Sequence, residues 1–232
     1  SLKELGCPGE KIKVQHLGVD LDKIPFQPRI RKPGEPLRVL IAGSFVEKKG
    51  FVYAFEALGR LKSESDLEIT VIGDAPPEPR GKREKKAILD VIAKYDLGSK
   101  VRMLGYQPYE VLFEEALANH VFLSPSAHSE DGDTEGGAPV TLSDLSASGM
   151  PVVSTTHCDI PNVILDEKSG LRAPARDVDG RVERLRWLER NPEKWQEMGE
   201  AGRQYLSAEF DAAKQGVRLA EIYQSTLSAR HQ

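Results

Sequence analysis

The chain has 232 residues, a length expected for one domain or slightly more. Its charged residues make up 29% of the sequence and leave a formal net charge of −4, which argues against nucleic acid as a partner. No run of 18 apolar residues occurs, so no membrane span is predicted.

Short apolar runs rich in β-branched residues alternate along the chain with segments of helical periodicity. Strands are predicted at Arg38–Ala42, Leu67–Ile72, Lys100–Leu104, His120–Leu123 and Pro151–Thr155. Helices are predicted at Phe51–Leu61, Arg83–Tyr95, Glu110–Asn119 and Val140–Ser148. This alternation is typical of βαβ units, so we expect an α/β fold with a Rossmann-like, doubly wound parallel sheet. Ligands bind such sheets beyond the carboxyl ends of the strands.

The tail from Asp177 to the end of the chain is charged, helical in pattern and poor in strands. Asn191-Pro192-Glu193 predicts a break between two helices, because proline is favoured in the first turn of a helix. Several large side chains are spaced as packing residues of helices that dock on the domain: Trp187, Trp195, Met198, Tyr205 and Phe210.

The segment Glu135–Val153 has the composition of an anion site. Glu135 leads into a Gly-Gly-Ala-Pro turn, whose small residues let a ligand approach the backbone. The helix predicted at Val140–Ser148 presents free N–H groups and the positive end of its dipole. Two carboxylates, Glu135 and Asp144, flank this helix start and suit the hydroxyls of a sugar or a ribose. The combination predicts a site for a sugar nucleotide.

The acidic stretch 128–135 has part of the spacing of a calcium loop. Position twelve of that loop, where a bidentate acid is required, would be Leu142. We therefore predict no metal site and no cofactor. We expect a mobile loop that shapes the sugar pocket, with Ser126 and His128 as candidate lining residues.

The segment from Glu135 resembles the donor-site signature of family 4 glycosyltransferases, which are retaining enzymes of the GT-B fold. Their signature reads E-x7-E, followed by a helix of small residues and G-[LM]-P-V-V, and the last part stands here as G-M-P-V-V from Gly149. The second acid is Asp144, where the family usually has glutamate. Glu135 stands one place early, because the turn after it contains one extra residue.

Other segments resemble the same family in order and spacing, from about residue 4 to about residue 228. They are Lys11–Asp20, Leu37–Gly50, Ile69–Asp74, Val101–Tyr106 and Val121–Ser126. The family has two Rossmann-like domains, with the acceptor domain first. The resemblance therefore implies that this chain is the C-terminal, donor half of a GT-B fold, without its acceptor domain.

The resemblance also divides the chain. We expect a remnant of the acceptor domain and a linker at residues 1–35, the nucleotide-sugar-binding domain at 36–176 and helices that pack on it at 177–232.

The resemblance assigns the catalytic role at the donor sugar to Glu135. It assigns donor binding to Gly43, Ser44, Lys48, Lys49, Gly73, Gly105, Tyr106, Gly136, Gly137, Ala138, Pro139, Val140, Thr141 and Asp144. Lys49 is implied as the phosphate lysine, and Asp144 as the acceptor of ribose hydroxyl hydrogen bonds. Ser44 replaces an arginine that the family tends to have, so one positive contact is lost or is supplied by Lys48.

Structural interpretations of the same residues stay open. Lys48 and Lys49 also suit a solvated helix start, and Tyr106 suits the rim of a turn. Asp144 also suits the early turn of a helix, where a carboxylate is favoured.

The implied activity is transfer of a sugar from a nucleoside diphosphate sugar, UDP- or GDP-linked, to a hydroxyl acceptor in polysaccharide or glycoconjugate synthesis. A glycan or lipid-linked acceptor would bind through the absent N-terminal domain, and the chain alone is expected to be inactive. Cys7 and Cys158 show no metal-type spacing and suit reduced thiols. We therefore expect a cytoplasmic protein. A lipid-linked acceptor would bring this protein to the inner face of the membrane. The alternatives are a non-catalytic nucleotide-sugar-binding module and a GT-B epimerase of UDP-sugars.

Overall fold

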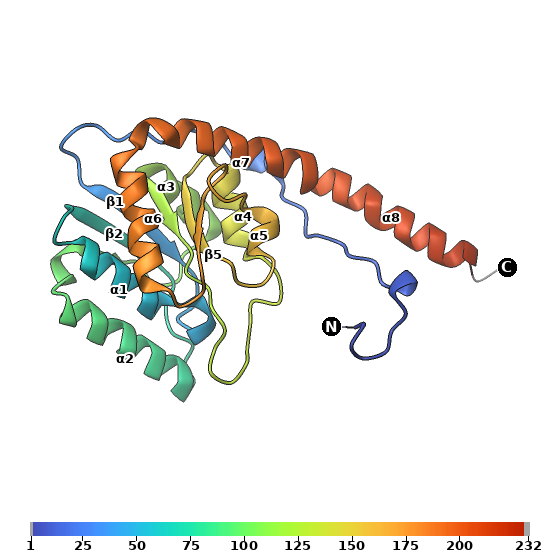
Figure 1. The fold of residues 1–232 in the computed structure, drawn as a ribbon, viewed down its shortest axis with the longest axis horizontal. Coiled ribbons are helices and arrows are strands. Elements are labelled where there is room, and N and C mark those ends of the chain that lie inside the picture. Colours follow the sequence, from blue (N-terminus) through green and yellow to red (C-terminus); the bar gives the residue numbers. More distant parts are fainter. Residues whose placement is uncertain (1, 230–232) are drawn as a thin grey trace. The chain divides into compact units, whose positions relative to one another are not determined.

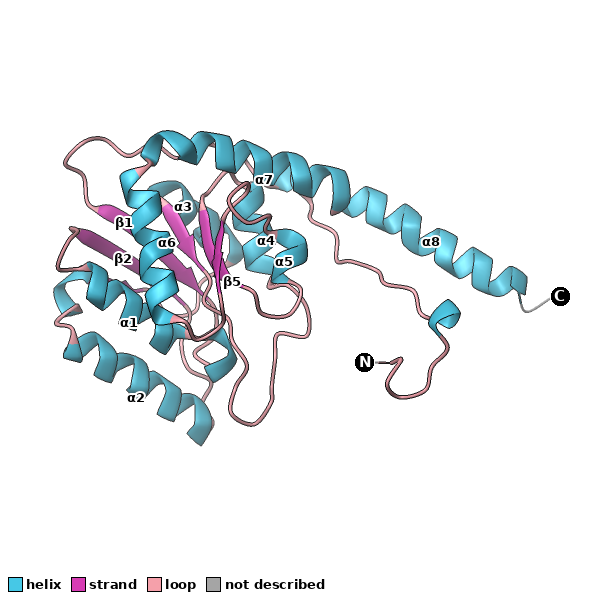
Figure 2. Ribbon diagram, in the orientation of Figure 1, coloured by secondary structure: helices cyan, strands magenta, loops and turns pink. Residues whose placement is uncertain are grey.

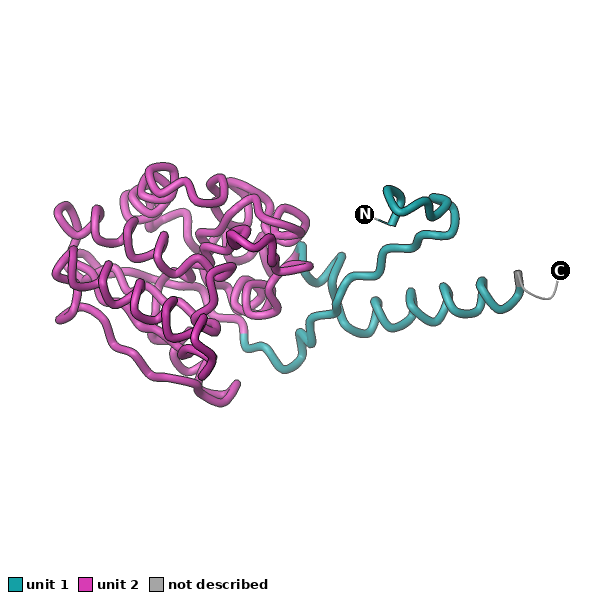
Figure 3. Tube along the Cα trace, turned by 90° about the horizontal axis from the view of Figure 1, so that it is seen from below, with its two compact units in different colours: residues 1–25, 205–232 teal, residues 26–204 magenta. Residues whose placement is uncertain are grey.

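The computed structural model describes residues 2–229, which form two compact units. The larger unit comprises Phe26–Gln204, and the smaller comprises Ser1–Pro25 with Tyr205–Gln232 (Figure 3). The larger unit contains every predicted site residue.

A parallel sheet of six strands lies at the centre of the larger unit, as far as the chain is described (Figure 1). The strands are β1 Leu37–Ala42, β2 Leu67–Ile72, β3 Val101–Met103, β4 Val121–Leu123, β5 Val152–Thr155 and β6 Leu171–Ala173. Their order across the sheet is β3-β2-β1-β4-β5-β6. The chain winds outward from β1 in one direction and from β4 in the other. The sheet is therefore doubly wound, as the sequence predicted.

Helices connect the strands and cover the sheet (Figure 2). They are α1 Phe51–Leu61, α2 Pro79–Lys94, α3 Tyr109–Ala118, α4 Val140–Ala147, α5 Ile160–Val163 and α6 Val178–Arg190. Short 3-10 helices lie at η1 Gly9–Lys11, η2 Leu21–Lys23, η3 Glu47–Lys49, η4 Gly98–Lys100 and η5 Pro192–Lys194. Helix α1 packs beside α2 and beside α6. None of the helices described is both long enough and apolar enough to cross a membrane.

The core forms where apolar strands meet the apolar faces of the helices. Strands of parallel sheets that are buried on both faces are mostly apolar. Strands β1 and β2 follow this pattern apart from Arg38, Glu68 and Thr70, and they pair in register from end to end. Fully buried large side chains include Phe45, Phe51, Phe55, Phe122 and Trp195. Trp195 also donates its indole N–H to the Leu188 carbonyl at 2.9 Å, which satisfies its polar group inside the core.

The predicted elements agree with the structure where the sequence pattern is long. The limits of α1 are those predicted, whereas α2 begins at Pro79, four residues before the predicted start, because proline is accepted in the first turn. The sequence pattern did not indicate α5 or β6, which have only four and three residues.

The predicted helical tail is present as α6, α7 Trp195–Glu209 and α8 Ala212–Ala229, with η5 at the expected break. In the smaller unit, Val19 forms a parallel bridge with Asp211, and the Val19 N–H donates to the Phe210 carbonyl at 2.7 Å. The Gln15 amide also donates to the Gln215 side chain at 2.6 Å. These contacts join the N-terminal segment to the start of α8.

Candidate nucleotide-sugar site

The predicted site residues follow the carboxyl ends of β1, β2, β3 and β4, and Lys49 and Glu135 lie in the loops after β1 and β4. Strands β1 and β4 are neighbours at which the winding direction changes, and ligands of open α/β sheets bind in the crevice at such a point. The two loops that follow them touch: the Ala127 N–H donates to the Lys48 carbonyl at 2.9 Å. Gly50 has φ +66°, and a Cβ atom there would lie 2.1 Å from the Pro125 carbonyl oxygen. The sequence thus permits this approach only with glycine at position 50.

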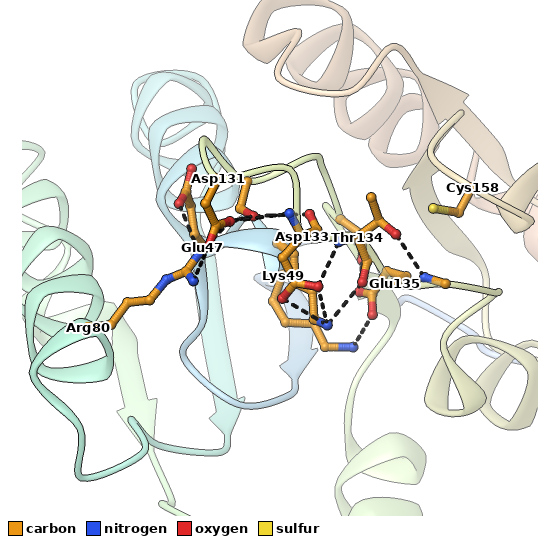
Figure 4. Close-up of polar contacts among 12 residues, drawn as sticks. Glu47, Lys49, Arg80, Asp131, Asp133, Thr134, Glu135 and Cys158 are labelled. Atoms are coloured by element: carbon orange, nitrogen blue, oxygen red, sulfur yellow. Dashed lines mark hydrogen bonds and ion pairs between the residues drawn. The ribbon is translucent and has the colours of Figure 1, made fainter.

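Glu135 is held from two sides at the centre of this cluster (Figure 4). One carboxylate oxygen lies 2.9 Å from Lys49 Nζ, and the other accepts from the Ser126 hydroxyl at 2.6 Å. Only 6% of the Glu135 side chain is exposed. A buried carboxylate is tolerated because it is paired and hydrogen-bonded. The ammonium of Lys49 has three protons, so it can hold Glu135 and still donate to another acceptor.

The turns after β1, β2 and β3 lie next to one another. Gly73 donates its N–H to the Gly105 carbonyl at 2.7 Å, and a Cβ atom on Gly73 would lie 1.9 Å from the Gly43 carbonyl oxygen. Ser44 follows Gly43 in the chain, and its backbone carbonyl accepts from the Val46 N–H at 2.9 Å. The predicted glycines after the three strands are therefore brought together in one row.

Tyr106 presents an exposed ring whose position is fixed by its hydroxyl. The hydroxyl donates to the Asp74 carbonyl at 2.7 Å, while 59% of the residue remains exposed. The Asp74 carboxylate lies 2.6 Å from Lys85 Nζ, and this hydrogen bond is the main reason that the pKa of Asp74 lies below its usual value. An anchored, exposed ring is suited to stacking against a flat base.

Helix α4 begins directly after the predicted turn at 136–139. Pro139 is its N-cap and accepts from the Leu142 N–H at 3.0 Å, so the N–H groups of Val140 and Thr141 precede the first hydrogen bond of the helix. Gly136 has φ +72°, and a Cβ atom there would meet no heavy atom within 4 Å. Val140, the first residue of α4, is 57% exposed, so the start of the helix is approachable, and its dipole favours an anion.

Asp144 lies one turn into α4 and is 4% exposed. The Tyr109 hydroxyl donates to its carboxylate at 2.6 Å. Burial raises the pKa of Asp144, and the hydrogen bond from Tyr109 partly opposes that change. Tyr109 is the first residue of α3, close behind Gly105 and Tyr106, so this contact connects the turn after β3 with α4.

The side chain of Lys48 contacts other residues than the side chain of Lys49, which binds Glu135. Its ammonium lies 3.2 Å from the Asp133 carboxylate and donates to the Thr134 carbonyl at 3.0 Å. A phosphate contact of Lys48 stays a prediction. Among residues 2–229, no group of three or more His, Cys, Asp or Glu side chains is arranged to hold a metal ion.

His157 is a site neighbour that the sequence did not indicate. It is 2% exposed, and its Nε2 accepts from the Glu135 N–H at 3.4 Å and lies 3.2 Å from Cys158 Sγ. Burial is the main cause that lowers the pKa of His157, and the nearby His128 ring adds to it. A neutral His157 can accept from the backbone of Glu135, and no local spacing in the sequence connects the two residues.

The comparison with protein families identifies the chain. The model of the family "Glycosyl transferases group 1" matches residues 22–205. The chain belongs to this family. The resemblance found in the sequence is thereby confirmed.

Similar proteins support the same assignment. The amylovoran biosynthesis glycosyltransferase AmsK of Erwinia amylovora, a polysaccharide enzyme, is 37% identical over 176 residues, which are 75% of this chain and 41% of AmsK. This chain thus spans less than half of the length of that relative.

Solved structures show the same fold. The C-terminal domain of the group 1 glycosyl transferase LpcC from Francisella tularensis superposes with a TM-score of 0.69 at 20% identity, over 84% of this chain and 99% of that domain. Anabaena HepE, solved in complex with UDP-glucose, superposes with a TM-score of 0.81 at 16% identity, over 96% of this chain and 60% of HepE. The fold is therefore that of the C-terminal half of a GT-B enzyme.

Proposed function

We propose that this chain is the donor-binding half of a retaining glycosyltransferase, which moves a sugar from a nucleoside diphosphate sugar to a hydroxyl acceptor in polysaccharide synthesis. The observation that carries the proposal is the convergence of Lys49, Glu135 and the start of α4 at the point where the sheet changes winding direction. We also propose residues 36–176 as the nucleotide-sugar-binding domain.

The diphosphate lies, in this proposal, between the turn after β1 and the start of α4. The backbone at Gly43 permits close approach, Lys49 supplies positive charge, and the N–H groups of Val140 and Thr141 donate to phosphate oxygens. Support comes from the approachable turn at Gly136 and from the ordinary use of helix starts and lysines for phosphate.

In this proposal the nucleoside lies next to the diphosphate, on the side of the turn after β3. Tyr106 stacks on the base beside the Gly105 backbone, and Asp144 accepts hydrogen bonds from the ribose hydroxyls. The hydrogen bond between Tyr109 and Asp144 supports this arrangement, because it connects the base side of the site with the helix that holds the phosphates. A stacked ring contributes about 1–3 kcal/mol per base.

The sugar lies against Glu135. During transfer the bond between the anomeric carbon and the diphosphate oxygen breaks, and its electron pair stays on the diphosphate. Lys49 and the N–H groups of α4 stabilise this developing charge, while Glu135 orients the ring and stabilises positive character on it. The acceptor hydroxyl forms the new bond to the anomeric carbon, and its proton passes to the departing diphosphate oxygen, which has gained the electron pair.

Calorimetric titration of the chain with UDP, GDP and ADP, each with and without magnesium, tests the proposal. We expect selective binding of one diphosphate that does not require magnesium. Equal affinity for all three, or no binding to any, would contradict a specific donor site in this chain.

A further inference from the structure

The acidic loop, defined as residues 128–135, lies against η3 and is held by the three consecutive side chains of that short helix (Figure 4). Glu47 accepts from the Glu130 N–H at 2.7 Å. Lys48 donates to the Thr134 carbonyl at 3.0 Å, and Lys49 binds Glu135 at 2.9 Å. Successive residues of η3 thus contact successive parts of the acidic loop.

Two arginines from distant elements reach the same loop. Arg80, in the first turn of α2, holds Asp131 with both ends of its guanidinium, one contact being 2.9 Å. Arg176, after β6, donates to the His128 carbonyl at 2.6 Å. Neither residue follows from the sequence motif, because each is more than 40 residues away from the acidic loop along the chain.

Glu47 is the point where these contacts meet. Its carboxylate lies 3.6 Å from Arg80 and 3.6 Å from Arg176, in addition to its bond with the Glu130 N–H. An isolated ion pair at a surface contributes little to stability, whereas charges that share one partner and a backbone hydrogen bond restrict a loop more strongly. Removing Glu47 would leave two arginines without a shared counter-charge and the Glu130 N–H without an acceptor.

We propose that Glu47 is a positioning residue, which holds the acidic loop against η3 and thereby sets the carboxylate of Glu135 for the donor sugar. This inference rests on the proposed function. In this proposal Glu47 acts through the acidic loop and contacts neither the nucleotide nor the sugar. Lys49 and Glu47 belong to the same short helix, so the phosphate lysine and the sugar carboxylate are kept at a fixed spacing.

The test compares Glu47→Ala, Glu47→Gln and the control Glu84→Ala. Glu84 lines the same pocket of about 360 Å³ as Glu47, Arg80 and Glu130, and it has no hydrogen bond or ion pair with the acidic loop among the described residues. Glutamine at position 47 keeps an acceptor for the Glu130 N–H but loses the charge that attracts the arginines.

The first readout needs no ligand and uses amide hydrogen exchange. We expect exchange in residues 128–135 to be at least about tenfold faster in Glu47→Ala, intermediate in Glu47→Gln and unchanged in Glu84→Ala. Unchanged exchange in Glu47→Ala would overturn the proposal. So would equal acceleration in the control.

The second readout compares affinities for UDP with UDP-glucose, and for GDP with GDP-mannose. In Glu47→Ala we expect about tenfold weaker binding of the nucleotide sugar, with the affinity for the bare diphosphate changed by less than about twofold, because only the sugar contact depends on Glu135. Equal loss for both ligands would overturn the link to Glu135. A wild-type chain that binds none of the four and does not bind ADP would instead contradict the proposed function, while hydrogen exchange would still decide whether Glu47 holds the loop.

Discussion

Lys49 and Glu135 form an ion pair at 2.9 Å that joins the loop after β1 to the loop after β4. The two residues are 86 positions apart in the chain, and the sheet brings them together because β1 and β4 are adjacent. The group proposed to bind phosphate thus lies in direct contact with the group proposed to bind sugar.

Lys49→Ala is expected to weaken binding of the preferred nucleoside diphosphate by about 10- to 100-fold. The substitution removes a charge-assisted hydrogen bond of about 1.5–3 kcal/mol. Calorimetry measures the change, with Lys82→Ala on the exposed face of α2 as a matched control. An unchanged affinity would show that Lys49 does not contact the ligand.

Glu135→Gln is expected to leave the affinity for the bare diphosphate unchanged or higher. Neutralising the carboxylate releases the Lys49 ammonium from its partner, so its charge becomes more available to phosphate. Any gain must act through Lys49. Where Glu135→Gln raises the affinity, the double variant with Lys49→Ala should therefore bind the diphosphate like Lys49→Ala alone, and a gain that persists in the double variant would count against the coupling.

Asp144→Asn is expected to stabilise the chain progressively, relative to the wild type, as the pH rises. Burial raises the pKa of Asp144 above its ordinary value of 3.8, so the folded chain retains the proton to higher pH than the unfolded chain. The contribution of Asp144 to the free energy of unfolding of the wild type therefore falls from about pH 3.8 up to the folded pKa and stays lower above it.

Urea denaturation of both proteins between pH 3.5 and 8 measures this difference, at intervals of about half a pH unit. The two proteins share every other titrating group, so the contributions of those groups cancel. A difference that shrinks as the pH rises would mean that Asp144 is stabilised as a carboxylate.

Gly73→Ala is expected to destabilise the larger unit by about 2–4 kcal/mol. Gly73 has φ +125°, and its added Cβ would lie 1.9 Å from the Gly43 carbonyl oxygen, so both strain and a clash follow. Gly98→Ala is the control, since Gly98 is exposed and its Cβ would have no neighbour within 4 Å. Thermal unfolding compares them, and equal melting temperatures would contradict the close approach of the two turns.

The sequence predicted the parts of the fold that have long apolar runs. Strands β1 and β2 are mostly apolar, and α1 shows helical periodicity between Gly50 and Lys62, so their limits agree closely with the structure. Helix α5 and strand β6 are too short for any periodicity. They depend on the neighbouring β5 for their place, which a single sequence does not reveal.

The sequence indicated site residues where they lie in local motifs, which are the segment from Glu135 to Asp144 and the turns after β1, β2 and β3. Glu135, the Gly-Gly-Ala-Pro turn and Asp144 are close in sequence, and one short segment indicates all of them. The partners Tyr109, His157 and Arg80 come from other elements. Tertiary packing decides which side chains of these elements face the site, and the spacing of residues along the chain does not predict it.

The most direct test of the account is NMR chemical-shift mapping of the labelled chain, titrated with the diphosphate that binds it. We predict that the largest amide shifts occur at Gly43, Gly105, Val140 and Thr141, with a smaller change at Glu135 that grows when the nucleotide sugar replaces the diphosphate. Largest shifts at the opposite end of the sheet, in the pocket lined by Arg38, Glu68 and Arg102, would contradict the proposed donor site.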